Sequence, residues 1–348
     1  MLEDLGSSNG TSLSGKELPQ GVCEVVDGDV VRCGRCLFVV CQDFRRLMIP
    51  PQRNEELGLV WAPCGIDSEW LPLKSVLLHR PGGELEATSE SPTDSLMLEG
   101  IDPIAIPLQH DAMAQLYRSL GVSVSYVQPP TLPPPNQLFA ADLFVMTPQG
   151  AILGRPASVV RAGEERWVAQ ALSGMGIPIL RSVWGEGTFE GADLMWLARD
   201  TALLAQGLRT NSQGAAQVQS ALRELGIRTV STHLPPGTMH LMGQLRIVDR
   251  DLAVGWPGRL PQDAIEALET NGFQVAFLPD QSEARGGFAL NVVVLGPREI
   301  LMPAGNPNTQ SFYEELGITC RTVEVGEIGK AAGSIGCLTG VLERESGE

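Results

Sequence analysis

The stretch "LRELGIRTVST" (residues 222–232) contains the pattern on which the predicted fold rests: the end of an amphipathic helix, a glycine, and a short run of β-forming residues. Gly226, directly after the last helical turn, is typical of the left-handed residue that ends many α-helices. The pattern occurs four more times, and its glycines are 45 to 55 residues apart. These copies are "YRSLGVSVSYV" (117–127), "LSGMGIPILRS" (172–182), "LETNGFQVAFL" (268–278) and "YEELGITCRTV" (313–323).

Between these helices lie pairs of apolar runs around a polar turn, which is typical of β-hairpins. Four pairs are "LFVMTPQGAILG" (143–154), "LMWLARDTALLA" (194–205), "LRIVDRDLAVGW" (245–256) and "VVVLGPREILMP" (292–303). A fifth begins near "LKSVLLHRPG" (73–82) and is completed by the last strand, after Cys337. Because one strand-strand-helix-strand unit cannot bury its apolar faces alone, the five copies should pack around one axis. We therefore predict an α/β fold, a five-bladed α/β propeller of ββαβ units, over about residues 62–346.

Composition restricts the classes of partner. The 348 residues are 43% hydrophobic and 19% charged, which suits one large domain or two smaller ones. The net charge of −16 and the lack of a basic block argue against nucleic acid or an anionic membrane as partner, and no apolar run approaches the ~20 residues of a membrane span. Seven cysteines, an odd number, favour free thiols in a reducing cytoplasm. The oligomeric state stays open.

The first 45 residues differ from the rest and are predicted to form a separate β-rich segment, followed by a linker over 46–61 and the main domain over 62–348. Four of the seven cysteines lie in this segment. Cys33 and Cys36 form a C-x-x-C pair, but no second pair follows at zinc-finger spacing. We interpret both as strand residues, so no metal site is expected there.

Aligning the repeats brings polar residues into register. Glu190 and His240 occupy equivalent positions just before the first strand of adjacent repeats, and Asp142, Asp193 and Asn291 share a second position three residues later. Equivalent positions in a ring of repeats face one axis. We therefore expect these side chains around one central pit, where a ligand would bind.

Each of these residues also has a structural interpretation. Asp142 alone could cap a turn, Glu190 and Asp193 could belong to a simple turn, and His240 could be an ordinary half-buried histidine. A single cysteine such as Cys337 is more often a buried thiol than a nucleophile. The combination favours chemistry, because a thiol beside an imidazole and carboxylates is the arrangement of a thiolate nucleophile with an acid/base partner.

Seven short motifs over about residues 70–345 resemble the guanidine-modifying superfamily, the penteins, which comprises arginine deiminases, amidinotransferases and dimethylarginine dimethylaminohydrolases. The motifs are "LKSVLLHRPG", "FAAD" (139–142), "FEGAD" (189–193), "GLRTN" (207–211), "GTMHL" (237–241), "MPAGNP" (302–307) and "GCLTGVL" (336–342). The fold of that family is the five-bladed propeller predicted above.

The resemblance implies Cys337 as nucleophile, His240 as general acid/base, Glu190 as its paired carboxylate and Asp142 as a holder of the guanidinium. Asp193 matches a second acid of the family, and we add it and Asn291 as candidate substrate-binding residues. The implied reaction is hydrolysis of an arginine-like small molecule through a covalent amidino-thioether, with neither metal nor organic cofactor. With an amine in place of water the same intermediate would make the protein an amidinotransferase.

Two positions depart from the family pattern. Many members have an arginine where this chain has Ala141, next to the guanidinium-holding Asp142. Deiminases and amidinotransferases usually have an aspartate two residues after the catalytic histidine, where this chain has Met242. Dimethylarginine hydrolases also lack an acid there, so a substituted guanidine is the predicted substrate. An inactive propeller of the same family is the alternative.

The amino-terminal segment resembles the second half of a forkhead-associated (FHA) domain, a phosphothreonine-binding β-sandwich. The resemblance rests on "LGSSNGT" (5–11) and "DGD" (27–29). The phosphate-binding residues of that family lie in the first half, which has no counterpart here. We therefore expect a partial FHA-like segment that does not bind phosphopeptides. A non-catalytic binding protein acting through this segment is the hypothesis from a different functional class.

Overall fold

The computed structural model describes residues 1–3, 11–18, 22–33, 36–40, 56–89 and 91–347. The chain divides into two compact units, Met1–Glu56 and Leu57–Glu348. Residues 5–10 of the FHA-like motif and 46–55 of the predicted linker lie outside the described residues.

The smaller unit is β-rich. Its described strands form a two-stranded sheet, β1-β4, and a four-stranded sheet in the order β3-β2-β5-β6. Cys33 and Cys36 lie opposite each other on β5 and β6, which confirms that both are strand residues. The strands are β1 (Leu2–Glu3), β2 (Thr11–Leu13), β3 (Lys16–Glu17), β4 (Val22–Cys23), β5 (Val30–Cys33) and β6 (Cys36–Val39).

The larger unit contains five three-stranded sheets, one for each predicted repeat. In each sheet an antiparallel pair of strands is followed by a third, parallel strand. The strands, sheet by sheet, are β21 (Gly340–Arg344), β7 (Leu73–Leu78) and β8 (Ser123–Tyr126); β9 (Phe144–Thr147), β10 (Gly150–Leu153) and β11 (Ile179–Ser182); β12 (Leu194–Ala198), β13 (Thr201–Gln206) and β14 (Arg228–His233); β15 (Leu245–Asp249), β16 (Leu252–Gly255) and β17 (Gln274–Phe277); β18 (Val293–Gly296), β19 (Glu299–Pro303) and β20 (Thr319–Val323).

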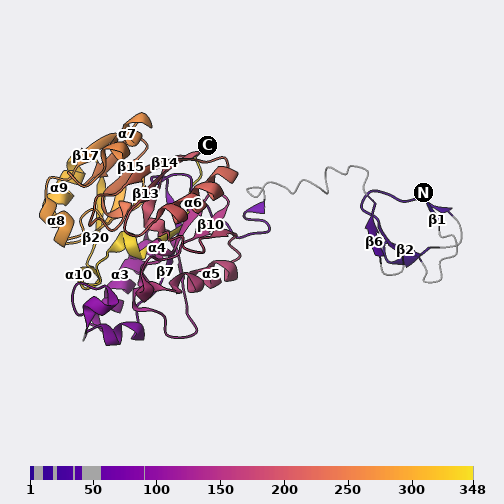
Figure 1. Cartoon of the computed structure of the whole chain (residues 1–348), viewed down its shortest axis with the longest axis horizontal. Coiled ribbons are helices and arrows are strands. Elements are labelled where there is room, and N and C mark those ends of the chain that lie inside the picture. Colours follow the sequence, from indigo (N-terminus) through magenta and orange to yellow (C-terminus); the bar gives the residue numbers. More distant parts are fainter. Residues whose placement is uncertain (4–10, 19–21, 34–35, 41–55, 90, 348) are drawn as a thin grey trace. The chain divides into compact units, whose positions relative to one another are not determined.

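One long helix connects the second strand of each unit to the third, and these helices lie at the periphery of the larger unit (Figure 1). They are α3 (Ala105–Ser119), α5 (Glu164–Gly174), α6 (Ser212–Glu224), α7 (Gln262–Thr270) and α9 (Pro307–Glu315). The glycine after each has a positive φ, 78° at Gly226, as the repeat predicted. Further short helices are η1 (Gly83–Ser89), η2 (Pro92–Ser95), η3 (Pro135–Leu138), α4 (Ala140–Leu143), η4 (Val159–Arg161), η5 (Gly191–Asp193), η6 (Leu241–Gly243), α8 (Gln281–Gly286), α10 (Gly326–Gly329) and α11 (Ile335–Leu338).

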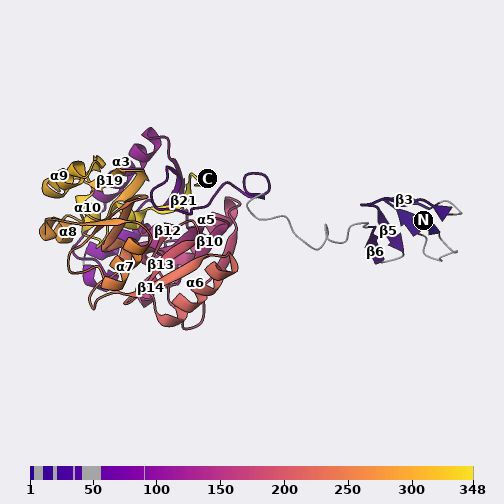
Figure 2. The same ribbon diagram turned by 90° about the horizontal axis from the view of Figure 1, so that it is seen from above.

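The first sheet is closed by the end of the chain. Strand β21, labelled in Figure 2, pairs antiparallel with β7, labelled in Figure 1, with Gly340 opposite Leu77. This confirms that the last strand completes the fifth hairpin. It also brings the segment that carries Cys337 next to residues from the start of the larger unit.

The hairpin strands form the core. Strands β9, β10 and β18 are buried at every position, because both faces are covered by neighbouring sheets or by the peripheral helices. The third strands, such as β11 and β14, are largely exposed or half-buried. Among the described helices, none is long and apolar enough to cross a bilayer.

Candidate active site

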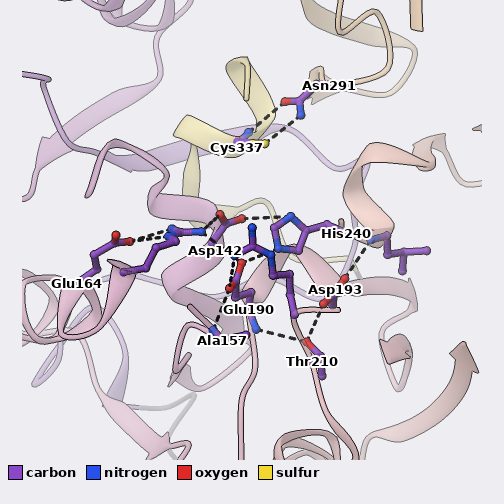
Figure 3. Close-up of polar contacts among 12 residues, drawn as sticks. Asp142, Ala157, Glu164, Glu190, Asp193, Thr210, His240, Asn291 and Cys337 are labelled. Atoms are coloured by element: carbon purple, nitrogen blue, oxygen red, sulfur yellow. Dashed lines mark hydrogen bonds and ion pairs between the residues drawn. The ribbon is translucent and has the colours of Figure 1, made fainter. Parts of the chain in front are cut away.

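The short helical turns before the first strand of each hairpin position the predicted site residues. Asp142 lies in α4, directly before β9, and Cys337 lies in α11, three residues before the start of β21. Glu190 and His240 are the residues just before η5 and η6. Because these turns occupy equivalent places in different repeats, side chains almost 200 residues apart in sequence meet in one region (Figure 3).

A pocket lies between these turns, with an empty volume of about 320 Å³ that includes space open to solvent. Asp142, His240 and Cys337 line it together. Its remaining walls are Leu96, Asn136, Phe139, Arg161, Arg209, Met239, Ala331 and Ala332. Of the six predicted site residues, three therefore line the pocket, two contact lining residues, and Asp193 lies behind the turn of His240, as described below.

His240 and Glu190 form a buried ion pair. The Nε2 atom of His240 lies 2.6 Å from Oε2 of Glu190, and the two residues are 5% and 0% exposed. Burial alone would lower the pKa of His240, but the charges of Asp142 and Glu190 and the hydrogen bond to Glu190 raise it to about 9. Burial would raise the pKa of Glu190, but His240 and two arginines lower it to about 2. At neutral pH the imidazole is therefore charged and carries a proton that it can give away.

These shifts predict the pH dependence of the pair. A carboxylate whose pKa falls from 4.5 to about 2 stabilises the fold above pH 4.5, and this contribution is lost as the pH falls toward 2. An imidazole whose pKa rises from 6.5 to about 9 stabilises it below pH 6.5, and this contribution is lost as the pH rises through 9.

The coupling free energy between His240 and Glu190 should therefore be largest between pH 4.5 and 6.5 and fall on both sides. A double-mutant cycle with His240→Asn and Glu190→Gln, measured by urea unfolding near pH ~3, ~5.5 and ~10, tests this. A coupling that does not vary among the three conditions would contradict the ion pair.

Arg161 was not predicted from the sequence, although it is central to the site. Its Nη1 donates to Oδ2 of Asp142 at 2.7 Å and to Oε2 of Glu190 at 3.3 Å. Its Nε and Nη2 both donate to Oε2 of Glu164, at 3.0 and 2.8 Å. The side chain is 3% exposed, and the three carboxylates raise its pKa above the usual range despite burial.

This contact bears on the departure at Ala141. That residue is buried and supplies no charge to Asp142. Arg161, from the separate turn η4, holds one oxygen of Asp142 instead. The other oxygen, Oδ1, has no hydrogen-bond partner among the described residues and lies 3.9 Å from Nδ1 of His240. One side of the carboxylate is thus fixed by the protein, while the other is available to a ligand.

Glu164 completes this buried network from the start of helix α5. It is 0% exposed, and burial raises its pKa to about 7, with Arg161 opposing the shift. Phe139 adds an aromatic face, with the guanidinium carbon of Arg161 5.8 Å from the ring centre. The geometry shows that the pocket wall accommodates a guanidinium between carboxylates and an aromatic ring.

Cys337 is held by the side chain of Asn291. The amide Nδ2 of Asn291 donates to Sγ of Cys337 at 2.9 Å, and the backbone N–H of Cys337 donates to Oδ1 of Asn291 at 3.1 Å. Burial and the charge of Asp142 raise the pKa of the Cys337 thiol, whereas the bond from Asn291 lowers it. Asn291, predicted to bind substrate, is therefore placed on the thiol and does not line the pocket.

Asp193 is also placed behind the pocket. Its two carboxylate oxygens accept hydrogen bonds from Oγ1 of Thr210 at 2.7 Å and from the backbone N–H of Leu241 at 3.0 Å. Since Leu241 follows His240, Asp193 anchors the turn that presents the imidazole. Burial raises the pKa of Asp193 to about 6.

Arg209 is a second residue that the sequence analysis did not single out. It lines the pocket and donates from Nη1 to Oε1 of Glu190 at 3.4 Å. Together with Thr210 it belongs to the motif "GLRTN" quoted above, so a signal for both was present. Arg161, by contrast, lies in no such motif.

Met242 does not line the pocket. It packs half-buried against the apolar cluster that includes Leu241 and Leu245. The methionine that does line the pocket is Met239. The departure at position 242 therefore does not change the lining of the pocket.

Asp142, Glu190 and His240 are also the one group among the described residues whose ligand atoms lie close enough together for a metal ion, within 4.8 Å of one another. Both carboxylates, however, already bind the cationic Nη1 of Arg161. The group therefore suits a guanidinium better than a divalent ion.

Comparison with known proteins relates the chain to enzymes of guanidine chemistry. A curated relative from Streptomyces coelicolor, N(G),N(G)-dimethylarginine dimethylaminohydrolase, is 27% identical over 269 residues, which are 77% of this chain and 97% of the relative. A solved structure of the Pseudomonas aeruginosa dimethylarginine dimethylaminohydrolase with citrulline superposes with a TM-score of 0.65 and 22% identity, over 77% of this chain and 99% of that one.

The fold also occurs in a transferase. The amidinotransferase SxtG of the saxitoxin pathway from Microseira wollei superposes with a TM-score of 0.64 and 16% identity, over 82% of this chain and 98% of that one. The family model described as N,N dimethylarginine dimethylhydrolase, eukaryotic, matches residues 101–342, more than two thirds of the chain. The α/β fold, the ββαβ repeats and this match agree, and the chain belongs to the N,N dimethylarginine dimethylhydrolase family.

Proposed function

We propose that the protein hydrolyses an N-methylated arginine to a ureido amino acid and a methylated amine, with Cys337 as the nucleophile. The observation that carries this proposal is the pocket in which the thiol, the charged imidazole of His240 and the free oxygen of Asp142 face the same small volume. Family membership and the name of the S. coelicolor relative support a methylated guanidine as substrate.

Asp142 would hold the substrate. Its free Oδ1 can accept from a guanidinium N–H, and charge-assisted bonds of this kind are short and strong. The positive charge of the bound guanidinium would also lower the raised pKa of the nearby Cys337 thiol, since an opposite charge favours the thiolate. Binding and activation of the nucleophile are thus coupled.

The chemistry follows in two steps. The thiolate attacks the guanidinium carbon, the bond from that carbon to the methylated nitrogen breaks, and His240 gives its proton to the departing amine. Water then attacks the same carbon of the amidino-thioether, His240 accepts a proton from it, and the bond to sulfur breaks to release the ureido product. Glu190 keeps the imidazole oriented and favours its charged form throughout.

The carboxylate at the other end of the substrate would be bound by an arginine side chain of the pocket. Arg209 lines the pocket, and its hydrogen bond to Glu190 is long, at 3.4 Å, whereas Arg161 is already bound to three carboxylates. Guanidinium groups bind carboxylates well because their planar donors match the two oxygens. We therefore expect an amino acid rather than an amine such as agmatine to be the substrate.

The direct test is a panel of guanidines at equal concentration: asymmetric and symmetric dimethylarginine, monomethylarginine, arginine and agmatine. Ureido product and released amine are measured in parallel. We expect turnover of at least one methylated arginine at about 10-fold or more the rate of arginine, because the matching family model and the S. coelicolor relative are both those of dimethylarginine hydrolases.

A faster reaction with free arginine would overturn the substrate assignment and leave a deiminase. Parallel reactions with added glycine test for a transferase. An amidino group found on glycine would show that an amine, and not water, is the second reactant. No turnover of any guanidine would contradict the enzymatic function itself.

We also infer that the five sheets of the larger unit surround one axis as a five-bladed propeller, with 62–348 as the catalytic domain. The closure of the first sheet by β21 and the meeting of turns from the separate repeats at one pocket support this arrangement. For residues 1–45 we propose a partial FHA-like segment without phosphopeptide binding. Its described strands are compatible with part of a β-sandwich.

A further inference from the structure

Arg246 is a buried cation outside the pocket whose role the proposed function does not include. It is the second residue of β15 and is 6% exposed. Its Nε donates to the carbonyl of Leu290 at 3.2 Å, and its buried Nη2 has no hydrogen-bond partner among the described residues. A buried guanidinium with an unused donor is costly and calls for an explanation.

The guanidinium packs against the segment that carries Cys337. A Cβ atom placed on Gly336 would lie 2.3 Å from Nη2 of Arg246 and 2.8 Å from Oδ1 of Asn291. Only glycine leaves room for both groups at the residue before the cysteine. Arg246 therefore touches the backbone one residue away from the proposed nucleophile.

The guanidinium of Arg246 also contacts the segment whose side chain binds the thiol. Leu290, its hydrogen-bond acceptor, directly precedes Asn291, whose side chain makes two bonds to Cys337. The backbone N–H of Gly336 also donates to the carbonyl of Asn291 at 3.2 Å. Arg246 thus links β15 to both chain segments that fix the position of the sulfur.

Groups on two sides of Cys337 change the pKa of its thiol in opposite directions. Asp142 and His240 face it in the pocket, and the Asp142 charge and burial raise the pKa of the thiol. Asn291, the backbone N–H of Ser334 and the charge of Arg246 lower it.

Around Arg246 itself lie Glu69 and two buried phenols, Tyr117 and Tyr313, whose pKa values burial raises so that both stay neutral. Glu69 also faces a second buried cation, Arg344. Burial lowers the pKa of Arg246 and Glu69 opposes this shift; a guanidinium nevertheless stays charged at neutral pH, so Arg246 opposes the carboxylate of Asp142 at the thiol.

We propose that Arg246 is a positioning residue for Cys337: it fixes the Leu290–Asn291 segment and Gly336 around the thiol and stabilises the thiolate before substrate arrives. This inference rests on the proposed role of Cys337 as nucleophile.

The test measures the thiol directly. The rate of alkylation of Cys337 by iodoacetamide is followed against pH by mass spectrometry of its peptide, for the wild type and Arg246→Gln. We expect the variant to react about 10-fold more slowly near neutral pH, with an apparent pKa about one unit higher, because one unit is a tenfold change in the thiolate fraction. Arg246→Lys should recover most of the rate.

Arg344→Gln is the matched control. Arg344 is equally buried, at 6%, and belongs to the same Glu69 cluster, but it donates to the carbonyl of Leu71. Its removal should leave the alkylation profile unchanged. Equal profiles for the wild type and Arg246→Gln, or an equal shift in Arg344→Gln, would overturn the proposal.

If Arg246→Gln does not fold, Glu69→Gln tests the same idea, with an expected change of the alkylation rate in the opposite direction. Without the opposing carboxylate, Arg246 should stabilise the thiolate more, and alkylation near neutral pH should become faster. An unchanged or slower rate would overturn the proposal. Because alkylation needs no turnover, this result does not depend on whether the proposed substrate is correct. A shift in the apparent pKa of Cys337 alkylation in a protein that hydrolyses no guanidine would reject only the proposed function.

Discussion

Replacing Cys337 by serine should reduce turnover of the guanidine substrate by about 10⁴-fold or more, as is typical when a covalent nucleophile is removed. A serine hydroxyl has a far higher pKa than a thiol, and the bound guanidinium cannot bring it into a useful range. His240 cannot act as the base for it, because its pKa of about 9 leaves it protonated at neutral pH. Initial rates of amine release measure the effect.

Acid-quenched reactions of the wild type should also contain protein heavier by the substrate without its departing amine, attached to the peptide of Cys337. The serine variant should not. Cys320→Ser is the control, since Cys320 is a half-buried free thiol on β20, away from the pocket. Substantial turnover by Cys337→Ser, or loss of activity in Cys320→Ser, would show that the nucleophile has been assigned wrongly.

Replacing Arg161 by glutamine should destabilise the protein by about 3–5 kcal/mol at neutral pH, the range expected when one partner of a buried ion network is removed. Asp142, Glu164 and Glu190 all accept hydrogen bonds from this one guanidinium, which is 3% exposed. Glutamine removes the cation that pairs with Glu164, and it leaves Glu190 with His240 and Arg209 and Asp142 with His240 as their positive neighbours. Urea unfolding of the two proteins gives the difference in unfolding free energy.

The difference should depend on pH in a defined direction. The pKa of Glu164 in the folded wild type is about 7, raised from 4.5, so the fold prefers the neutral acid, and the cost of ionising it grows as the pH rises through this interval. Removing Arg161 raises that cost further. The part of the loss that comes from Glu164 should therefore grow as the pH rises above 7 and disappear below it, where this acid is neutral in both folded proteins.

Arg166→Gln is a suitable comparison for this measurement. Arg166 is exposed on helix α5, with its guanidinium carbon 4.2 Å from the ring centre of Trp167. Its removal should change stability by less than about 1 kcal/mol, with no such pH dependence. An Arg161→Gln variant as stable as Arg166→Gln would mean that the buried network contributes little to the fold.

Much of the fold follows from the repeat in the sequence. The glycine after each long helix, as at Gly226, has the left-handed conformation that the sequence predicted. Each hairpin forms with the predicted partners, and the last strand closes the first sheet. These features are local, or repeat a local pattern, so hydrophobic periodicity and turn chemistry are enough to predict them.

Part of the site was also predicted. Asp142, His240 and Cys337 meet because each directly precedes a hairpin in its own repeat, and this position is visible in the sequence. The repeat did not show that Asp193 supports the turn of Leu241, or that Asn291 holds the thiol. Both lie at the predicted position, but their side chains turn away from the pocket.

By itself, the sequence determined the α/β repeat, the closure of the chain and the residues capable of thiol, imidazole and carboxylate chemistry, since all of these depend on residue type and spacing. Only the tertiary structure decided which charges oppose one another. Arg161 and Arg246 lie in none of the seven family motifs and at unrelated positions of their repeats. They nevertheless supply the buried positive charges next to Asp142 and Cys337. The physical reason is that a pKa depends on burial and on distances through space, which spacing along the chain does not specify.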